Sequence, residues 1–483
     1  MKRIKLTNKL KHALAYAVAL LVGISSCTKN GPTEKRVNMY GLNASIEEPA
    51  SVRLRHKNLS ETDNDLHVGC EALDRGYGDY EAYKAYLNPL GMRYIRLQAG
   101  WARCEKEEGV YDFAWLDRII DDALSRGLKP WLQLSYGNPL YKGGGNSYSS
   151  SELPKSAEAL AAWDKWVQAT AEHYNGRVDV WEIWNEPDLK IAEGKNTVAQ
   201  LVNLSVRTAE LLRQVNPQAE IAALALAKAD MTLVQEFFSG VKKAGKLDLF
   251  DWISYHAYSY IPEQSQAEAE RLRGAVAAFS KDIRLWHGES GAPSKGHLGG
   301  ALSDYDWSEI SQAKWALRNM IGDKAHGIRT GIYTIAENNY SAGKNTKGLL
   351  ETNALNMVTR AKPAYYAARN LVSVNNLLHT PEDASIIRVC SEQIIVKYLF
   401  SDANGKFRSA VICAGGEIPD DEEDFGRVSV SVTGFSFKDP VAIDLRTGLI
   451  FPLEHYESEN FQSLYRVPFY DSPVLITEAS ALE

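Results

Sequence analysis

The sequence predicts an α/β fold, a (β/α)8 TIM barrel that is followed by a C-terminal β-sandwich. Between residues 66 and 375, short apolar runs alternate with longer amphipathic segments, as in repeated strand-helix units around a parallel sheet. After residue 375 the apolar residues recur at alternate positions, as in sandwich strands. The chain has 483 residues, enough for more than one core. We therefore assign residues 61–375 to the barrel and 376–483 to the sandwich.

The first 27 residues predict an export signal. Lysines and arginines precede the apolar run 13–24, which is too short to span a bilayer. The following Ile-Ser-Ser-Cys resembles a bacterial lipobox, so Cys27 is the predicted lipidation site. The alternative is an ordinary signal peptide with a cysteine there by chance. We expect an exported bacterial lipoprotein, periplasmic or at the cell surface, held to the membrane by its lipid anchor. Residues 28–60 would form a tether and could add an edge strand to the sandwich.

Eight buried strands are predicted in the barrel, each rich in β-branched or aromatic residues. They span residues 67–72, 94–99, 130–135, 178–184, 220–226, 252–255, 283–289 and 331–336. Helices with apolar residues at helical spacing are predicted at 115–126, 156–173, 197–215, 264–279, 310–324 and 363–371. A doubly wound sheet is the alternative, but no glycine-rich phosphate loop follows the first strand.

The sandwich is predicted from six short strands that are separated by Gly, Asp, Asn and Pro turns. They span residues 385–389, 393–400, 409–413, 428–432, 441–444 and 474–477. The acidic run 420–424 predicts an exposed loop. A calcium site is the alternative, but the run lacks the ordered ligand spacing of such a site.

Charge and cysteine usage exclude several function classes. The net charge is −7 and no long basic run follows the N-terminus, so we expect no nucleic-acid partner. The cysteines are scattered, with no CxxC pair or histidine cluster, so we predict no metal site. We also expect no cofactor, and the sequence indicates no particular protein partner.

The string WEIWNEPD, residues 181–188, is the most informative motif. Its β-branched and aromatic residues predict a buried strand, and Pro187 ends that strand because it cannot donate a ladder hydrogen bond. Glu186 therefore lies where the fourth barrel strand opens into a loop. Catalytic groups of parallel barrels lie at these carboxyl ends of the strands. We predict that Glu186 is catalytic; a solvated loop glutamate is the alternative.

A second carboxylate ends the seventh strand, three strand-helix units later. The segment 283–291 (IRLWHGESG) is again an apolar strand that closes on a glutamate, Glu289, and it ends in Gly291. Hydrolysis of a glycosidic bond uses two carboxylates that flank the bond. Strands four and seven could supply them across the barrel mouth.

On these two motifs the chain resembles the clan A retaining glycoside hydrolases, whose acid/base glutamate follows an asparagine on strand four and whose nucleophile ends strand seven. WEIWNEPD is most similar to glycoside hydrolase family 39, the family of β-xylosidases and α-iduronidases. The resemblance implies that Glu186 is the general acid and base and that Glu289 is the nucleophile. The string WHGESG differs from the Thr-Glu-Phe type of that family, and the sugar stays open.

The separation of the two carboxyls decides the stereochemistry. Retention requires about 5 to 5.5 Å between them, whereas inversion requires about 6.5 to 9.5 Å to admit a water. We predict the shorter separation. Because two close like charges favour one group staying protonated, we expect the pKa of Glu186 to be raised.

Further site residues follow from their positions at strand ends. Asn185 could bond the 2-hydroxyl of the sugar. The resemblance implies that Arg96, on strand two, keeps the nucleophile ionised and that Tyr258, just after strand six, bonds to it. His256 lies beside Tyr258 in the same segment. Five more residues are predicted to line the sugar site: Trp101, Tyr136, Asn138, Trp286 and Glu337, the last as the main rival carboxylate.

The sequence thus predicts a retaining glycoside hydrolase that cleaves β-glycosidic bonds in oligo- or polysaccharides by a two-glutamate double displacement. The alternative is a catalytically inactive carbohydrate-binding lipoprotein on the same barrel scaffold. Burying two acids without a catalytic use would cost stability, which favours the enzyme. A serine hydrolase is excluded because GESGA fails the G-x-S-x-G spacing. The expected partners are the saccharide substrate and the membrane.

Overall fold

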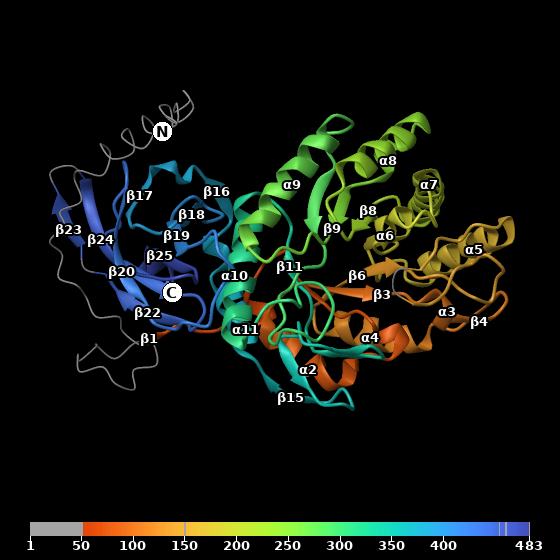
Figure 1. Ribbon diagram of the computed structural model, residues 1–483, viewed down its shortest axis with the longest axis horizontal. Coiled ribbons are helices and arrows are strands. Elements are labelled where there is room, and N and C mark those ends of the chain that lie inside the picture. Colours follow the sequence, from red (N-terminus) through yellow and green to blue (C-terminus); the bar gives the residue numbers. More distant parts are fainter. Residues whose placement is uncertain (1–51, 149–150, 454, 459–460, 483) are drawn as a thin grey trace, which may run out of the picture.

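The computed structural model describes residues 52–148, 151–453, 455–458 and 461–482. A barrel and a β-sandwich lie side by side in it (Figure 1). The predicted signal segment 1–27 and its Cys27 lie outside the described residues. In the described part of the chain, no helix combines the length and the apolar composition that a membrane crossing requires.

The barrel is built from eight parallel strands, which confirms the predicted fold class. Going round the sheet, the order is β11–β2–β3–β6–β7–β8–β9–β10, and a parallel bridge between Trp286 and Arg329 brings the two edges together. The bounds are β2 (His67–Gly69), β3 (Tyr94–Gln98), β6 (Lys129–Leu134), β7 (Val180–Ile183), β8 (Glu220–Leu226), β9 (Trp252–Tyr255), β10 (Arg284–His287) and β11 (Gly331–Ile332).

The seventh and eighth strands are shorter than the sequence predicts. They end at His287 and Ile332, not at residues 289 and 336. The apolar residues that follow β11, such as Ile335 and Ala336, are buried outside the ladder, so apolar composition alone does not mark where a strand ends.

Helices surround the barrel and include several that the sequence did not predict. The bounds are α2 (Tyr80–Leu90), α3 (Trp101–Cys104), α4 (Ala114–Ser125), α5 (Ala157–His173), α6 (Pro187–Ala192), α7 (Val198–Val215), α8 (Met231–Lys243), α9 (Pro262–Ala277), α10 (Glu309–Ala325) and α11 (Pro363–Ser373). The unpredicted helices are α2, α3, α6 and α8. Two of them carry aspartate N-caps, since the Asp79 carboxylate accepts from Glu81 N and that of Asp230 accepts from Thr232 N.

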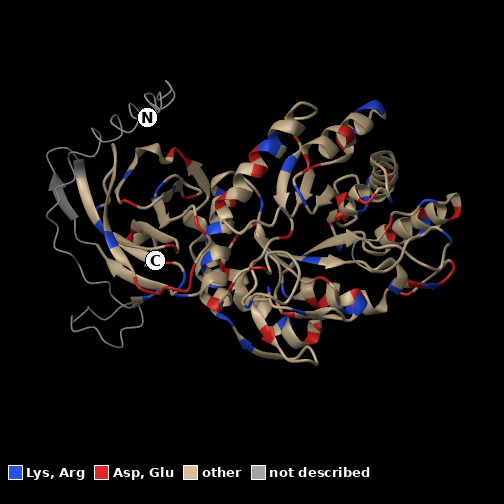
Figure 2. Cartoon of the chain, in the orientation of Figure 1, with Lys and Arg blue, Asp and Glu red and all other residues tan. Residues whose placement is uncertain are grey.

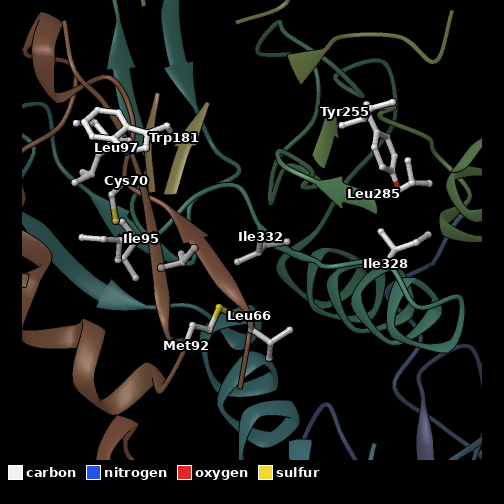
Figure 3. Close-up of a cluster of buried hydrophobic side chains, with 14 of the residues drawn as sticks. Leu66, Cys70, Met92, Ile95, Leu97, Trp181, Tyr255, Leu285, Ile328 and Ile332 are labelled. Atoms are coloured by element: carbon white, nitrogen blue, oxygen red, sulfur yellow. The ribbon is translucent and has the colours of Figure 1, made fainter. Parts of the chain in front are cut away.

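Side chains alternate along the barrel strands between the lumen and the outer core. On β3, Ile95 and Leu97 face outward into the large hydrophobic core, part of which is shown with Leu285 in Figure 3. The lumen is filled by its own cluster: Tyr94, Trp131, Val180, Ala222, Trp252 and Trp286. The barrel interior is therefore a packed core.

The sandwich consists of a seven-stranded and a four-stranded antiparallel sheet. The first has the order β1–β22–β21–β25–β19–β18–β16 and the second β17–β20–β24–β23. The bounds are β1 (Val52–Arg53), β16 (Thr380–Glu382), β17 (Ile387–Cys390), β18 (Ile395–Ser401), β19 (Arg408–Ala414), β20 (Gly426–Val432), β21 (Pro440–Asp444), β22 (Leu449–Pro452), β23 (His455–Ser458), β24 (Phe461–Phe469) and β25 (Val474–Glu478). The edge strand β1 lies within the segment 28–60 and pairs with β22.

Helix α10 lies between the barrel and the sandwich (Figure 1). Its buried Lys314 forms ion pairs with Asp420 and Asp471 of the sandwich, at 2.9 and 2.5 Å. The acidic run 420–424 is therefore not only the exposed loop that the sequence predicts, because its first carboxylate fixes the domain junction. Elsewhere acidic and basic residues are interspersed over both domains (Figure 2).

Candidate active site

A cavity of about 790 Å³ opens at the carboxyl ends of the barrel strands. Its lining includes both predicted catalytic glutamates, Glu186 and Glu289, together with Asn185, Tyr136 and Tyr258. The chain leaves the sheet at this end of a parallel barrel, so side chains from different strands converge there.

Glu186 lies three residues beyond the end of β7 and occupies the N-cap position of α6, whose first residue is Pro187. Its backbone adopts a left-handed conformation with φ 49° and ψ 50°, and its amide donates to the carbonyl of Ala225 over 2.9 Å. This sharp turn points the carboxyl across the cavity, where Oε1 lies 3.0 Å from Nδ1 of His256.

Glu289 lies two residues beyond β10 and is held by two donors. Arg96 donates from Nη1 to its Oε2 over 3.0 Å, and the Tyr258 hydroxyl donates to its Oε1 over 2.8 Å. Burial favours the neutral acid, but His256, Arg96 and the bond from Tyr258 outweigh burial and lower the pKa of Glu289. The site therefore keeps Glu289 ionised.

His256 lies between the two glutamates. Its Nδ1 is 3.0 Å from Glu186 and 3.9 Å from Oε2 of Glu289. Burial disfavours a charged imidazole, but the carboxylates of Glu289 and Glu186 outweigh burial and raise the pKa of His256. The backbone of His256 is held by His287, whose Nε2 donates to the His256 carbonyl over 2.7 Å.

The two glutamates are close together. One carboxylate oxygen of Glu186, one of Glu289 and a ring nitrogen of His256 all lie within 4.8 Å of one another. Two carboxylates and an imidazole could hold a divalent cation. The guanidinium of Arg96, however, already supplies positive charge beside Glu289 and would repel such an ion.

Arg96 also orients Asn185 beside the glutamates. It faces the lumen from β3 and donates from Nη2 to Oδ1 of Asn185 over 3.0 Å. Asn185 in turn donates from Nδ2 to the hydroxyl of Tyr136 over 2.9 Å. One hydrogen-bonded network thus connects several predicted residues around the glutamates: Arg96, Tyr136, Asn185, Tyr258 and Glu289.

Residues 74–280 match the family model described as "Glycosyl hydrolases family 39". The match covers most of the barrel and includes Arg96, Asn185, Glu186, His256 and Tyr258. Over these residues the barrel is therefore similar to glycosyl hydrolases family 39. The match ends before Glu289, so the role of Glu289 rests on its geometry.

Two curated relatives match the same part of the chain. A β-xylosidase of Caldicellulosiruptor saccharolyticus is 26% identical over 217 residues, which are 40% of this chain and 43% of the relative. A β-xylosidase of Geobacillus stearothermophilus is 22% identical over 210 residues, 39% of this chain and 40% of the relative. The chain thus matches less than half of the length of either relative.

Solved structures match the fold over more of the chain. A family 39 glycoside hydrolase from the gut symbiont Bacteroides cellulosilyticus WH2 superposes with a TM-score of 0.61 at 18% identity, covering 87% of this chain and 82% of that one. A monomeric β-xylosidase from Caulobacter crescentus CB15 gives 0.57 at 16% identity, with coverage of 88% and 97%. At these identities the likeness shows the fold, and it includes both domains.

Two tryptophans that were predicted to line the sugar site lie elsewhere in the barrel. Trp286 points into the lumen and stacks on Trp131, with ring centroids 3.8 Å apart. Trp101 is buried among the helices and donates from Nε1 to Glu105 over 2.6 Å. Neither lines the cavity of the glutamates. An aromatic residue one or two positions from a strand end can pack in the hydrophobic core as readily as it can line the sugar site.

Two predicted polar residues are also absent from the lining of that cavity. Asn138 donates from Nδ2 to the carbonyl of Glu105 over 2.9 Å and so fixes the loop after β6. Glu337 forms buried ion pairs with Lys362 at 3.0 Å and Lys344 at 2.6 Å. The rival carboxylate of strand eight is thus a structural anion.

Two further carboxylates, which were not predicted from the sequence, contact Arg96. Oε1 of Glu71, just after β2, lies 2.8 Å from Nη1, and Oε2 of Glu182 on β7 accepts from Nε over 2.8 Å. Burial raises the pKa of Glu71 to about 7, although Arg96 opposes the rise. Glu71 follows a barrel strand, so the rule that identified Glu186 and Glu289 could have found it.

Proposed function

We propose that the protein is a retaining glycoside hydrolase that cleaves β-glycosidic bonds, with Glu289 as nucleophile and Glu186 as general acid and base. The observation that carries the proposal is the approach of the two glutamates to within 4.8 Å, with Arg96 and Tyr258 bonded to Glu289. Such an approach fits the separation of about 5 to 5.5 Å that retention requires. The curated relatives are named β-xylosidases, which makes β-xylosides natural test substrates.

In the first step, the carboxylate of Glu289 attacks the anomeric carbon and forms a glycosyl ester. The bond to the leaving oxygen breaks, and the proton of Glu186 passes to that oxygen. His256 faces Glu186 at 3.0 Å and orients its carboxyl toward the bond. Asn185, which Arg96 and Tyr136 hold, is placed to bond the 2-hydroxyl of the sugar.

In the second step, a water attacks the anomeric carbon of the ester from the face that the leaving group vacated. Glu186, now a carboxylate, removes a proton from that water, and the ester bond to Glu289 breaks. Two inversions at one carbon give net retention, and both glutamates return to their initial protonation states. Arg96 and Tyr258 stabilise the departing carboxylate through the bonds that they already make to it.

Hydrolysis of 4-nitrophenyl β-xyloside, β-glucoside and β-glucuronide tests the proposal, with the first anomer of the product followed by proton NMR. We expect the β-anomer to appear first and Glu289→Ala to lose activity by about 10⁴-fold or more. Glu236→Ala, which removes an exposed carboxylate on α8, should match the wild type. Release of the α-anomer would contradict retention. Sugar binding without hydrolysis of any glycoside would favour the inactive binding protein instead.

The lipid anchor is part of the proposal and rests on the sequence around Cys27, outside the described residues. Acylation of a cysteine after a short apolar segment would hold the enzyme at a membrane surface. Cell fractionation of a bacterial host is the test, with Cys27→Ser as the variant. The wild type should sediment with membranes and the variant should not; a soluble wild type would contradict the anchor.

A further inference from the structure

The cavity contains a buried lysine whose ammonium group has no partner among the residues that the structure describes. Lys347 lines the cavity, is 3% exposed, and lies between β13 (Gly343–Asn345) and β14 (Leu350–Thr352). Its backbone is fixed, since its amide donates to Asn345 Oδ1 over 3.0 Å and its carbonyl accepts from Gln312 Nε2 over 3.0 Å. Within the described residues, Nζ makes no hydrogen bond and no ion pair.

The surroundings of Lys347 make this lack of a partner costly. Burial lowers the pKa of Lys347 to about 8, although the charge of Glu289 opposes the shift. Glu289 lies too far away for an ion pair and is already held by Arg96 and Tyr258. Nζ otherwise faces the Tyr258 ring, 5.5 Å from its centroid. A desolvated ammonium without an anion destabilises the fold unless a ligand supplies one.

We infer that Lys347 binds an anionic substituent of the sugar that occupies the cavity beside Glu289, so that the preferred substrates are β-glycosides of acidic sugars carrying a carboxylate or a sulfate ester. This inference rests on the proposed function. A neutral hydroxyl could accept a hydrogen bond from Nζ but would leave the charge uncompensated. An anion forms a charge-assisted bond, which is about twice as strong as a neutral one.

The charges around the cavity are compatible with an acidic sugar. Glu71, Glu186 and Glu289 would repel an anion, but their ion pairs with Arg96 and His256 offset their charge. Gly300 also lines the cavity near Nζ, and a Cβ built there would lie 3.8 Å from Nζ. No carboxylate of the described chain comes within ion-pair distance of Nζ, so the ammonium group is available to a ligand anion. Arg75 and Lys228 add further positive charge to the lining of the cavity.

Matched aryl glycosides that differ only at carbon six test the inference: 4-nitrophenyl β-D-glucoside, β-D-glucuronide and 6-O-sulfo-β-D-glucoside. The variant is Lys347→Met, which removes the charge and keeps the chain length. Lys295→Met is the control, because it removes an exposed lysine from the neighbouring loop. Binding of free D-glucuronate and D-glucose is measured by calorimetry in the same proteins, so that recognition has a readout apart from turnover.

We expect the wild type to prefer an acidic glycoside over the glucoside. Lys347→Met should lower kcat/KM for that substrate by about 10- to 100-fold, the effect of one charged hydrogen bond, and lower kcat/KM for the glucoside much less. The glucuronide and sulfate arms show which anion is accepted. Faster turnover of the glucoside, or equal losses on both substrates in Lys347→Met, would overturn the inference while the proposed hydrolase stands. Lys347-dependent binding of glucuronate without any hydrolysis would retain the anion site and reject the hydrolase.

Discussion

Arg96 and Glu289 form an ion pair inside the barrel, with 3.0 Å between Nη1 and Oε2. The arginine is fully buried and also contacts Glu71 and Glu182, so one guanidinium serves three carboxylates. An arginine fork can bond several acceptors at once in fixed directions, which a lysine cannot do. This geometry connects the position of the nucleophile to the stability of the barrel core.

Replacement of Arg96 by lysine should therefore damage both catalysis and folding. We expect kcat/KM to fall by about 100- to 1000-fold, as when one preorganised charge-stabilising group is lost. The melting temperature should also fall, because at least one buried carboxylate is left unpaired. The control is Arg126→Lys, which alters a surface ion pair with Asp122. Wild-type kcat/KM in Arg96→Lys would show that the arginine is not needed for the chemistry.

Removal of the Tyr258 hydroxyl should change the pH dependence of the reaction. The hydroxyl donates to Oε1 of Glu289 and so helps to lower the pKa of that carboxyl. Without it the pKa of Glu289 rises, and the acidic limb of the kcat/KM profile of Tyr258→Phe should move to higher pH. Tyr148→Phe, at an exposed tyrosine, is the control. An acidic limb that stays in place would contradict the assigned bond.

Glu71 should make the protein less stable above neutral pH. Its pKa is raised to about 7 in the folded protein from an ordinary value near 4.5, so the folded state holds the proton more tightly than the unfolded state does. Its contribution to stability is complete below about pH 4.5 and is lost as the pH rises through 7. Glu71→Gln mimics the protonated acid.

Melting curves of Glu71→Gln at pH 5 and pH 8 check this assignment. We expect a higher melting temperature than the wild type at pH 8 and a similar one at pH 5. In the wild type, an ionised Glu71 competes with Glu289 for Nη1 of Arg96, so the variant should also retain more activity at pH 8. A variant that is equally destabilised at both pH values would indicate that Glu71 is ionised throughout.

Glu337 should matter for stability but not for the reaction. Its carboxylate compensates the buried Lys362, which is 1% exposed, and also contacts Lys344. Glu337→Gln leaves a buried ammonium unpaired, which costs about 3 to 5 kcal/mol of unfolding free energy. Denaturant unfolding should show this loss, while kcat at a temperature where the variant is folded should equal that of the wild type. A large loss of kcat in folded protein would restore Glu337 as a catalytic candidate.

The sequence alone was sufficient for the fold class and for the centre of the site. Strand ends of a parallel barrel converge, so residues placed at strand ends, such as Arg96, Glu186, His256 and Glu289, could be grouped without coordinates. Trp286 was misplaced because its side chain points down the lumen from within β10, and a composition pattern does not give the depth of a residue in the barrel.

Other parts of the site depend on contacts between distant segments. Glu337 could not be separated from the catalytic acids by sequence because its partner Lys362 comes from a later hairpin and helix junction. Lys347 lies beyond the eighth barrel strand, in a segment with no periodic pattern in the sequence. Only its burial beside the cavity identifies it as a candidate binding residue. Such features arise from tertiary packing, which local propensity does not encode.

Trapping of the glycosyl ester is the most direct measurement of the proposed mechanism. A 2-deoxy-2-fluoro-β-glycosyl fluoride of the best-cleaved sugar should inactivate the enzyme and add one fluorosugar mass to the peptide that contains Glu289. Glu289→Gln should take up no label, and release of the label by water should restore activity in the wild type. Labelling at Glu186 or at Glu71, or turnover with no covalent adduct and an inverted product, would contradict the assignment of Glu289 as the nucleophile.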